Sequence, residues 1–173
     1  ERATGKTYLA LVQGTWPAAN KVIDLPLHKY LLPDGERRVR VTTPDDPDGM
    51  RSVTLVKVRA HLAPRPLQGL PSMTLLEVTI KTGRTHQIRV HLASQGHPIA
   101  GDDKYGDFDL NKRLPRQGLK RMFLHAWRLQ FNHPARGERV TLHAELPPEL
   151  ADFIDPNALG NPPCPPTDHA ALT

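Results

Sequence analysis

At 173 residues the chain is long enough for one domain with a substantial hydrophobic core. Its 23 lysines and arginines outnumber the 18 aspartates and glutamates, and the net charge of +5 favours an anionic partner without separating nucleic acid from a membrane surface. No apolar run is long enough to span a bilayer, and the aromatic content of 5% argues against a surface built mainly on base stacking. The single cysteine, Cys164, allows no internal disulfide, which predicts a cytoplasmic location.

The first half of the chain is predicted to form strands separated by turns. An apolar strand over residues 8–12 is expected to end at Gly14, and strands are also predicted over residues 53–62 and 73–80. A proline, an aspartate and a glycine at 33–35 predict a turn, because proline presets φ and glycine accepts positive φ. The strand after it, over residues 37–41, is predicted to have valines on one face and a cationic outer face made by Arg37, Arg38 and Arg40.

The second half begins with a predicted helix. Thr85 is expected to be its N-cap, and Gly96 followed by Pro98 is expected to end it. Residues 99–119 are predicted to be irregular. Period-two alternation over 123–131 predicts a strand that pairs with residues 140–144 across a turn at His133, and 148–153 are predicted to form a short helix.

Many strands and few helices predict an α+β fold built on a largely antiparallel sheet. One domain is expected over residues 1–155. The proline-rich composition of residues 156–173 predicts a disordered tail.

The most informative run is TGRTHQIRVH, at residues 82–91. It places Arg84 on the turn and Arg89 near the start of the helix. A cation there opposes the helix dipole, so we expect an anion nearby, either a carboxylate or a phosphate. The alternative is a solvated basic face.

Five segments together resemble the RluA-type RNA pseudouridine synthases. TGRTHQIRVHL is followed by GHPIAGDDKYGD at residues 96–107, in the manner of that family's third signature segment. The other matches are a K-x-Y-x-A strand at 6–10, an F-L-H-A strand at 123–126 and an H-P turn at 133–134. KYLLPDGERRVRV, residues 29–41, further resembles the RluC-like branch that acts on large-subunit ribosomal RNA.

The resemblance implies the pseudouridine synthase fold, a mixed, largely antiparallel sheet with a central active-site cleft. It also implies isomerisation of specific uridines, with 23S ribosomal RNA as the expected partner and with no cofactor or metal. In this family an aspartate attacks the nucleotide; Arg89 matches the arginine that pairs with it, and Tyr8 matches the tyrosine that packs on the flipped base. RNA contacts are expected from six residues: Arg84, His86, Gln87, Arg37, Arg38 and Arg40. We expect a monomer without membrane association.

One departure from the family pattern concerns the nucleophile. The family carries its aspartate in an H-R-L-D segment before the K-x-Y strand, and that segment is absent here. We therefore expect this chain to be the C-terminal part of a catalytic domain and to be inactive by itself. Arg89 should lie in a cleft near Tyr8, and without the aspartate it should be hydrated, bound to an anion or paired with a substitute carboxylate.

Several of these residues have simpler alternatives. Tyr8 fits a core position of a strand, and His86 and Gln87 fit a role in capping local backbone. His91 is expected to face the core. Asp102 and Asp103 are expected to be solvated or to cap a turn, and the arginines of 37–40 fit a hydrated strand face equally well.

Two other functional classes compete with the enzyme. The first is an RNA-binding module without catalysis, which explains the positive charge equally well. The second is a metal-dependent nuclease, for which the adjacent Asp102 and Asp103 give little support because ligand spacing is lacking.

Overall fold

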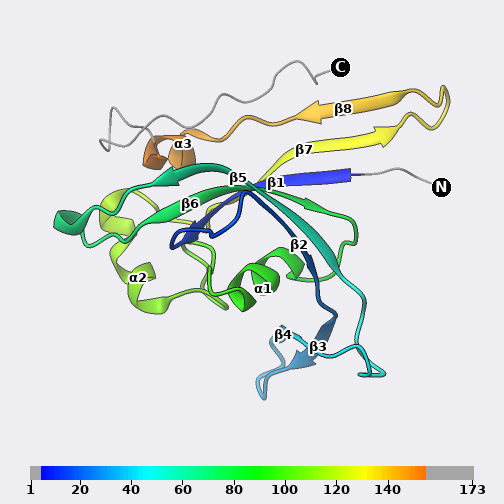
Figure 1. Cartoon of the computed structure of the whole chain (residues 1–173), viewed down its shortest axis with the longest axis horizontal. Coiled ribbons are helices and arrows are strands. Elements are labelled where there is room, and N and C mark those ends of the chain that lie inside the picture. Colours follow the sequence, from blue (N-terminus) through cyan, green and yellow to red (C-terminus); the bar gives the residue numbers. More distant parts are fainter. Residues whose placement is uncertain (1–4, 155–173) are drawn as a thin grey trace.

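A computed structural model describes residues 5–154 of the chain. Its frame is one six-stranded sheet, with a separate two-stranded hairpin below it in Figure 1. The strands of the large sheet run in the order β2-β5-β6-β1-β7-β8. Their bounds are β1 Gly5–Gln13, β2 Asn20–Asp24, β5 Val53–Leu62, β6 Met73–Ile80, β7 Leu124–Asn132 and β8 Arg139–His143.

The predicted α+β class with a largely antiparallel sheet is confirmed. Every strand pair within residues 5–154 is antiparallel, so the mixed character expected of the sheet is not found in this part of the chain. β1 and β7 shift register between Thr7 and Tyr8, where Trp127 is the extra residue of a bulge.

The central strand β1 is buried on both faces, which explains its continuous apolar run. Leu9 and Leu11 pack into one hydrophobic cluster together with Phe153 of helix α3 (Pro148–Ile154). Ala10 and Val12 pack into a second cluster that includes Ile88 of helix α1 (Gln87–Ser94). The sheet therefore has a core on each side, and α1 covers the side to which Ala10 points.

The hairpin consists of β3 (Leu27–Leu31) and β4 (Arg37–Val41). The predicted turn between them is confirmed: Gly35 has φ of 88°, and Leu32 N–H donates to the carbonyl of Glu36. Val39 of β4 forms a small core with Leu27 and with Val90 of α1. This contact seats the hairpin against the helix.

Helix α1 (Gln87–Ser94) begins later than expected, and the assignment of Thr85 as its N-cap is wrong. His86 occupies that position with φ of 54°, the one positive φ outside glycine among residues 5–154. The predicted end is confirmed. Gly96 is left-handed, its N–H donates to Ala93, and His97 N–H donates to Leu92, which is the paired hydrogen-bond pattern of a Schellman motif.

Residues 99–119 are more ordered than predicted, since they contain helix α2 (Phe108–Arg113) and a 3₁₀ turn at Pro115–Gln117. Asp107 caps α2 by accepting from Leu110 N–H. A second 3₁₀ turn spans Pro66–Gln68. The predicted tail, residues 156–173, lies outside the described residues. No helix in the described part combines the length and apolar character needed to cross a membrane.

Candidate active site

Arg89 and Asp102 form the centre of the site. Arg89 Nε donates to Asp102 Oδ2 at 3.0 Å, and Nη2 donates to Oδ1 at 2.7 Å. The Asp102 side chain is fully buried and that of Arg89 is 13% exposed. This two-point geometry is the strong form of a charged hydrogen bond. The expectation that Arg89 meets an anion is confirmed, and the anion is a carboxylate of the same chain.

The loop after α1 fixes Asp102 in the site. Asp102 Oδ1 accepts the backbone N–H groups of Lys104 and Tyr105, while Asn111 donates to the carbonyl of Asp102. Burial opposes the charge on Asp102, but the hydrogen bonds from Arg89 and from these N–H groups outweigh it and hold the pKa of this carboxyl below its usual value. Of the two alternatives expected for Asp102, solvation or turn capping, the structure shows turn capping.

The adjacent carboxylate, Asp103, is 87% exposed and lies 3.6 Å from Arg89 Nη2. The hydrogen bond with Asp102 is the main cause that raises the pKa of Arg89 above its ordinary value. Arg89 is therefore a permanent cation held on one side by a permanent anion.

Tyr105 supports Arg89 from a second direction. The Arg89 guanidinium lies over the Tyr105 ring, 5.3 Å from its centroid. The Tyr105 hydroxyl accepts from Val39 N–H at 2.9 Å and lies 2.7 Å from His86 Nδ1. The hydroxyl keeps one proton and one further lone pair, so it can donate to His86 Nδ1 or accept from it, depending on the imidazole tautomer. Burial, together with the nearby Arg89, lowers the pKa of His86 and so favours the neutral imidazole.

Gln87 belongs to the framework of the site. It is 3% exposed, and its Nε2 donates to Val53 O and to Thr54 Oγ1. Its Oε1 accepts from Thr82 Oγ1 and from Arg84 N–H. The whole amide is thus occupied, so the expected RNA contact of Gln87 is not supported and the alternative, bonding to local backbone, is what the structure shows.

His91 extends the same network into the core, as predicted. Its side chain is fully buried. His91 Nε2 donates to Leu25 O at 2.8 Å, so Nδ1 is the acceptor for the Thr54 hydroxyl at 2.7 Å. Burial is the first cause that lowers the pKa of His91.

The cationic residues of the hairpin divide into two groups. Arg37 and Arg40 are exposed, as is Lys29 on β3. Arg38 instead pairs with Glu36 at 3.1 Å and lies over the Tyr105 ring, 5.9 Å from its centroid. The predicted single face with three arginines is wrong, because Arg37 shares the strand parity of Val39.

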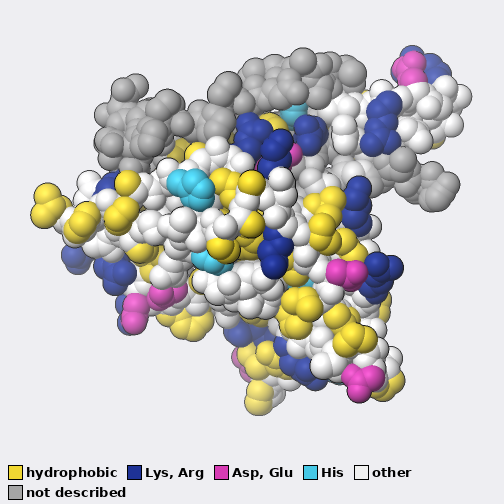
Figure 2. Space-filling model, in the orientation of Figure 1, with side chains coloured by type: hydrophobic (Ala, Val, Ile, Leu, Met, Phe, Trp, Pro, Cys, Tyr) yellow, Lys and Arg dark blue, Asp and Glu magenta, His cyan; other side chains and the backbone are white. Residues whose placement is uncertain are grey.

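A pocket of about 260 Å³ connects the hairpin to the turn before α1, with Arg37, Arg38 and Thr85 in its lining. Figure 2 shows Lys and Arg side chains over this lower part of the molecule, mixed with hydrophobic and a few acidic ones. On the turn itself, Arg84 is half-buried and its Nε donates to the carbonyl of Arg51. The surface is therefore basic but not purely so.

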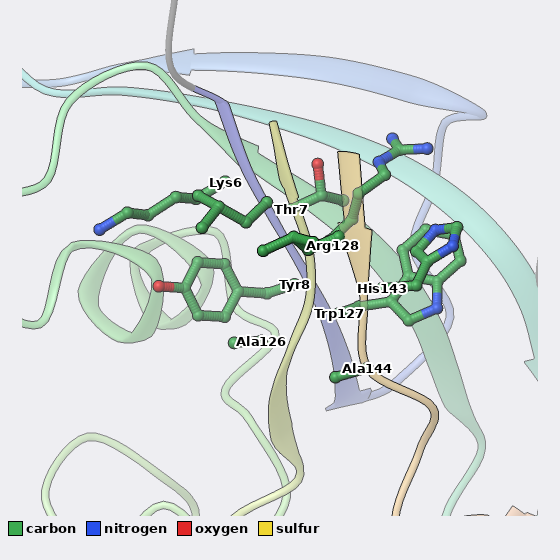
Figure 3. A pocket seen from close by; sticks show the side chains of 10 residues that line it. Lys6, Thr7, Tyr8, Ala126, Trp127, Arg128, His143 and Ala144 are labelled. Carbon is green, nitrogen blue, oxygen red and sulfur yellow. The ribbon is translucent and has the colours of Figure 1, made fainter. Parts of the chain in front are cut away.

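Tyr8 lies on β1 beside a different pocket of about 320 Å³ (Figure 3). In that view Lys6 and Tyr8 project to one side of β1, and the stacked rings of Trp127 and His143 lie on the other. Tyr8 packs against the cluster that contains Ile88, so it lies on the sheet face that α1 covers. Arg89 does not line this pocket, and a single cleft shared by Tyr8 and Arg89 stays a prediction.

Metal chemistry gains no support from residues 5–154, in which no group of three or more histidine, cysteine, aspartate or glutamate side chains is placed to hold an ion. Asp102 and Asp103 are the adjacent carboxylates considered above for a metal site, and Asp102 is neutralised by Arg89.

Sequence comparison identifies the family. The family described as RNA pseudouridylate synthase matches residues 1–94, more than half of the chain. The chain belongs to the RNA pseudouridylate synthase family. The matched residues include both the strand of Tyr8 and the turn and helix that present Arg89.

Two curated members of this family show the level of similarity. The ribosomal large subunit pseudouridine synthase C of Pasteurella multocida is 43% identical over 154 residues, which are 89% of this chain and 44% of the relative. The protein of the same name from Escherichia coli strain K12 is 43% identical over 148 residues, 84% of this chain and 43% of the relative. The chain thus spans less than half the length of these relatives.

Solved structures confirm the pseudouridine synthase fold. Human RNA Pseudouridylate Synthase Domain Containing 1 superposes with a TM-score of 0.71 at 23% identity, covering 95% of this chain and 62% of the human chain. Human RNA Pseudouridylate Synthase Domain Containing 4 gives 0.64 at 24% identity. At this identity the likeness carries the fold alone.

Proposed function

We propose that the protein converts uridine to pseudouridine in RNA, with 23S ribosomal RNA as its substrate, by an aspartate nucleophile that lies outside this chain. The observation that carries the proposal is the fixed position of Arg89 in a chain that belongs to this family. The naming of the relatives after the large ribosomal subunit supports the choice of RNA.

The geometry of Arg89 suits a residue that orients a second carboxylate. Asp102 holds Nε and Nη2, and within the described part of the chain Nη1 has no hydrogen-bond partner. Nη1 is therefore the group that can hold the nucleophile. Because Asp102 and the Tyr105 ring fix two sides of the guanidinium, the third side is presented without loss of side-chain freedom at the moment of binding.

The remaining chemistry requires the target uracil to lie outside the RNA helix, since its reacting atoms are inaccessible while it is stacked. Tyr8 offers an aromatic face next to a pocket, which suits packing against a flipped uracil. The aspartate attacks the nucleotide and the glycosidic carbon–nitrogen bond breaks. When the base rejoins through carbon, the bond to the aspartate breaks, that carbon loses its proton and the freed nitrogen takes up a proton. This isomerisation has no net redox change and calls for no cofactor.

RNA binding is assigned in the same proposal to polar residues near the site. The exposed cations Arg37 and Arg40 lie on the hairpin, and the half-buried Arg84 and His86 lie on the turn before α1. Phosphate contacts of this kind position the RNA without reading its sequence. A cytoplasmic location and a monomeric state belong to the same proposal, supported by the ribosomal substrate and by the single cysteine of the chain.

The competing function is RNA binding without catalysis, for which the basic surface is sufficient. Activity decides between the two. The isolated chain should form no pseudouridine in unmodified 23S ribosomal RNA, whereas the full-length gene product should. Turnover by the isolated chain would show that the nucleophile has been misplaced, and a full-length product that binds RNA without turnover would favour the binding module.

A pair of arginine substitutions tests the role of Arg89. In the full-length protein, Arg89→Ala should abolish most turnover, because the loss of one member of a buried charged pair costs roughly 3–5 kcal/mol. Arg84→Ala should mainly weaken RNA binding, since the Arg84 side chain bonds a backbone carbonyl at the surface. Single-turnover rates at saturating RNA separate the two effects. Equal losses of rate would contradict the assignment.

A further inference from the structure

The hairpin β3–β4 is tied to the loop that holds Arg89. Glu36, which directly precedes β4, pairs with Arg38 of that strand and with Lys104 of the loop. Arg38 lies over the Tyr105 ring on one side, and the Arg89 guanidinium lies over the same ring. Tyr105 is thus in contact with one arginine of the hairpin and with the arginine of the candidate active site.

The Tyr105 hydroxyl makes the most specific of these contacts. β4 pairs with β3 on one edge, where Val39 lies opposite Lys29, and its other edge has no strand partner among residues 5–154. The N–H of Val39 is directed to the Tyr105 hydroxyl at 2.9 Å. Val39 is itself buried, so this N–H needs an acceptor within the protein. One side-chain oxygen therefore replaces a missing strand at the middle of β4.

The position of the hairpin relative to α1 otherwise depends on a small contact. Its apolar core against the rest of the protein is the cluster of Leu27, Val39 and Val90, with Val41 and Tyr105 packed against it. A two-stranded hairpin is at best marginally stable without such support. The hydrogen bond from Val39 N–H to the Tyr105 hydroxyl is therefore one of a few links that set the orientation of the hairpin, together with the Glu36–Lys104 pair and the backbone bridge between Leu27 and Met50.

We propose that Tyr105 is a positioning residue. Its ring packs on Arg89 while its hydroxyl fixes the basic hairpin, so that RNA bound by the hairpin is held in a fixed position relative to Arg89. The inference rests on the proposed function for its RNA, but the mechanical link between Tyr105 and Val39 does not. The two halves of the side chain have separate tasks. Removing the hydroxyl should affect RNA placement, and removing the ring should also affect the chemical step.

The link itself is tested without RNA. Amide hydrogen exchange of this chain, followed by NMR, should show the protection of Val39 falling about two- to tenfold in Tyr105→Phe, as expected when one typical hydrogen bond is removed. Tyr30→Phe is the matched control, since Tyr30 lies on the same hairpin and its hydroxyl has no hydrogen bond with another described residue. Unchanged protection of Val39 in Tyr105→Phe, or an equal fall in Tyr30→Phe, would overturn the proposal.

The consequence for RNA is tested in the full-length protein with in vitro transcribed 23S ribosomal RNA. Tyr105→Phe should raise KM about three- to tenfold and change kcat less than about twofold, on the same hydrogen-bond scale. Tyr105→Leu should lower kcat as well, because the ring no longer packs on Arg89. Thermal unfolding of both variants checks that each is folded at the assay temperature.

The outcomes of this second experiment are distinct. A loss of kcat in Tyr105→Phe equal to that in Tyr105→Leu would overturn the division of tasks, and an unchanged KM together with reduced Val39 protection would overturn the role in RNA placement. If the wild-type protein neither binds nor modifies the RNA, the proposed function fails. The Val39 measurement then still reports whether Tyr105 holds the hairpin.

Discussion

Asp102 and Asp103 are neighbours in sequence with opposite environments, one fully buried against Arg89 and the other almost fully exposed. Asp102→Asn should lower the free energy of unfolding by roughly 3–5 kcal/mol, because Arg89 would keep its charge in a largely buried place with only the exposed Asp103, 3.6 Å away, as a counter-charge. Asp103→Asn should change it by less than about 0.5 kcal/mol. Urea denaturation of the two variants measures the difference, and similar stabilities would contradict the importance assigned to the Arg89–Asp102 pair.

His91 makes the stability of the fold dependent on pH. Its pKa is lowered from 6.5 by burial, so the unfolded chain binds a proton at a higher pH than the folded chain does. The contribution of His91 to the free energy of unfolding is therefore fully present above about pH 6.5, and it is lost as the pH decreases below that value. His86, whose pKa is also lowered, adds to the same trend.

The His91 contribution can be isolated by substitution. His91→Gln retains a donor for Leu25 O and removes the titration, so its unfolding free energy should depend less on pH than that of the wild type, over the range in which histidine titrates. His61→Gln, at an exposed position of β5, is the control and should keep the wild-type slope. Denaturant titrations at several pH values provide the comparison; parallel slopes for all three proteins would exclude His91 as the source.

Residue-level prediction succeeded where local physics was sufficient. A cation in the first turn of a helix predicts an anion, and Arg89 has one. The identity of the anion could not be predicted, because an aspartate in a polar loop is normally solvated. Only the fold shows that Asp102 is buried and accepts hydrogen bonds from the N–H groups of residues 104 and 105.

At the scale of elements, the loop 101–106 depends on a glycine for close packing. A Cβ on Gly106 would lie 2.3 Å from the carbonyl oxygen of Asp102, a backbone atom that cannot move aside without shifting the carboxylate. Gly106→Ala should therefore destabilise the protein by about 1–3 kcal/mol, as overpacking does.

Gly83→Ala is the matched control, because nothing lies within 4 Å of a Cβ at that position. It should leave the melting temperature unchanged or slightly raised, since alanine restricts the unfolded chain. Differential scanning calorimetry compares the two variants. Equal melting temperatures would show that the loop tolerates the extra methyl group and that Asp102 is less rigidly placed than the structure indicates.

Elements with a regular apolar pattern were predictable, and elements with a single fully buried residue were not. The bounds predicted for β4, β5 and β6 agree with the structure. β3 was missed because Leu27 is its one fully buried residue, and α2 because Leu110 is its one buried residue, so neither shows a periodic apolar pattern. The start of α1 was misplaced because His86 occupies the N-cap position with φ of 54° and no side chain caps the helix, so the Thr85 hydroxyl was not a valid signal.

For the whole molecule, the proposed RNA interface implies strong dependence on salt, because phosphate contacts release counterions. Replacing Arg37, Arg38 and Arg40 together with alanine should flatten the slope of log affinity against log salt. Arg37 and Arg40 should account for most of that change. The magnitude of the slope should fall by about 0.7–0.9 for each phosphate that is no longer neutralised. Arg38 is paired with Glu36 and should contribute less.

Filter-binding titrations of the full-length protein at several salt concentrations measure these slopes. Lys112→Ala with Arg116→Ala removes two exposed cations from α2 and the turn after it, and so controls for net charge. If this control flattens the slope as much as the Arg37 and Arg40 substitutions do, the hairpin is not the RNA-binding surface.

The Arg89–Asp102 pair joins residues only 13 positions apart, whereas the contact between Thr7 and Thr79 closes a separation of 72. On loop length alone, closing the longer segment costs about 1.5 kcal/mol more in chain entropy. The candidate site is therefore local in sequence and can assemble early, while the strand that carries Tyr8 is recruited by slow, distant pairing. β1 lies at the centre of the sheet and its Leu11 carbonyl accepts from Ala100 N–H, next to the loop of Asp102, so Tyr8 and the final position of Asp102 both depend on the pairing of β1.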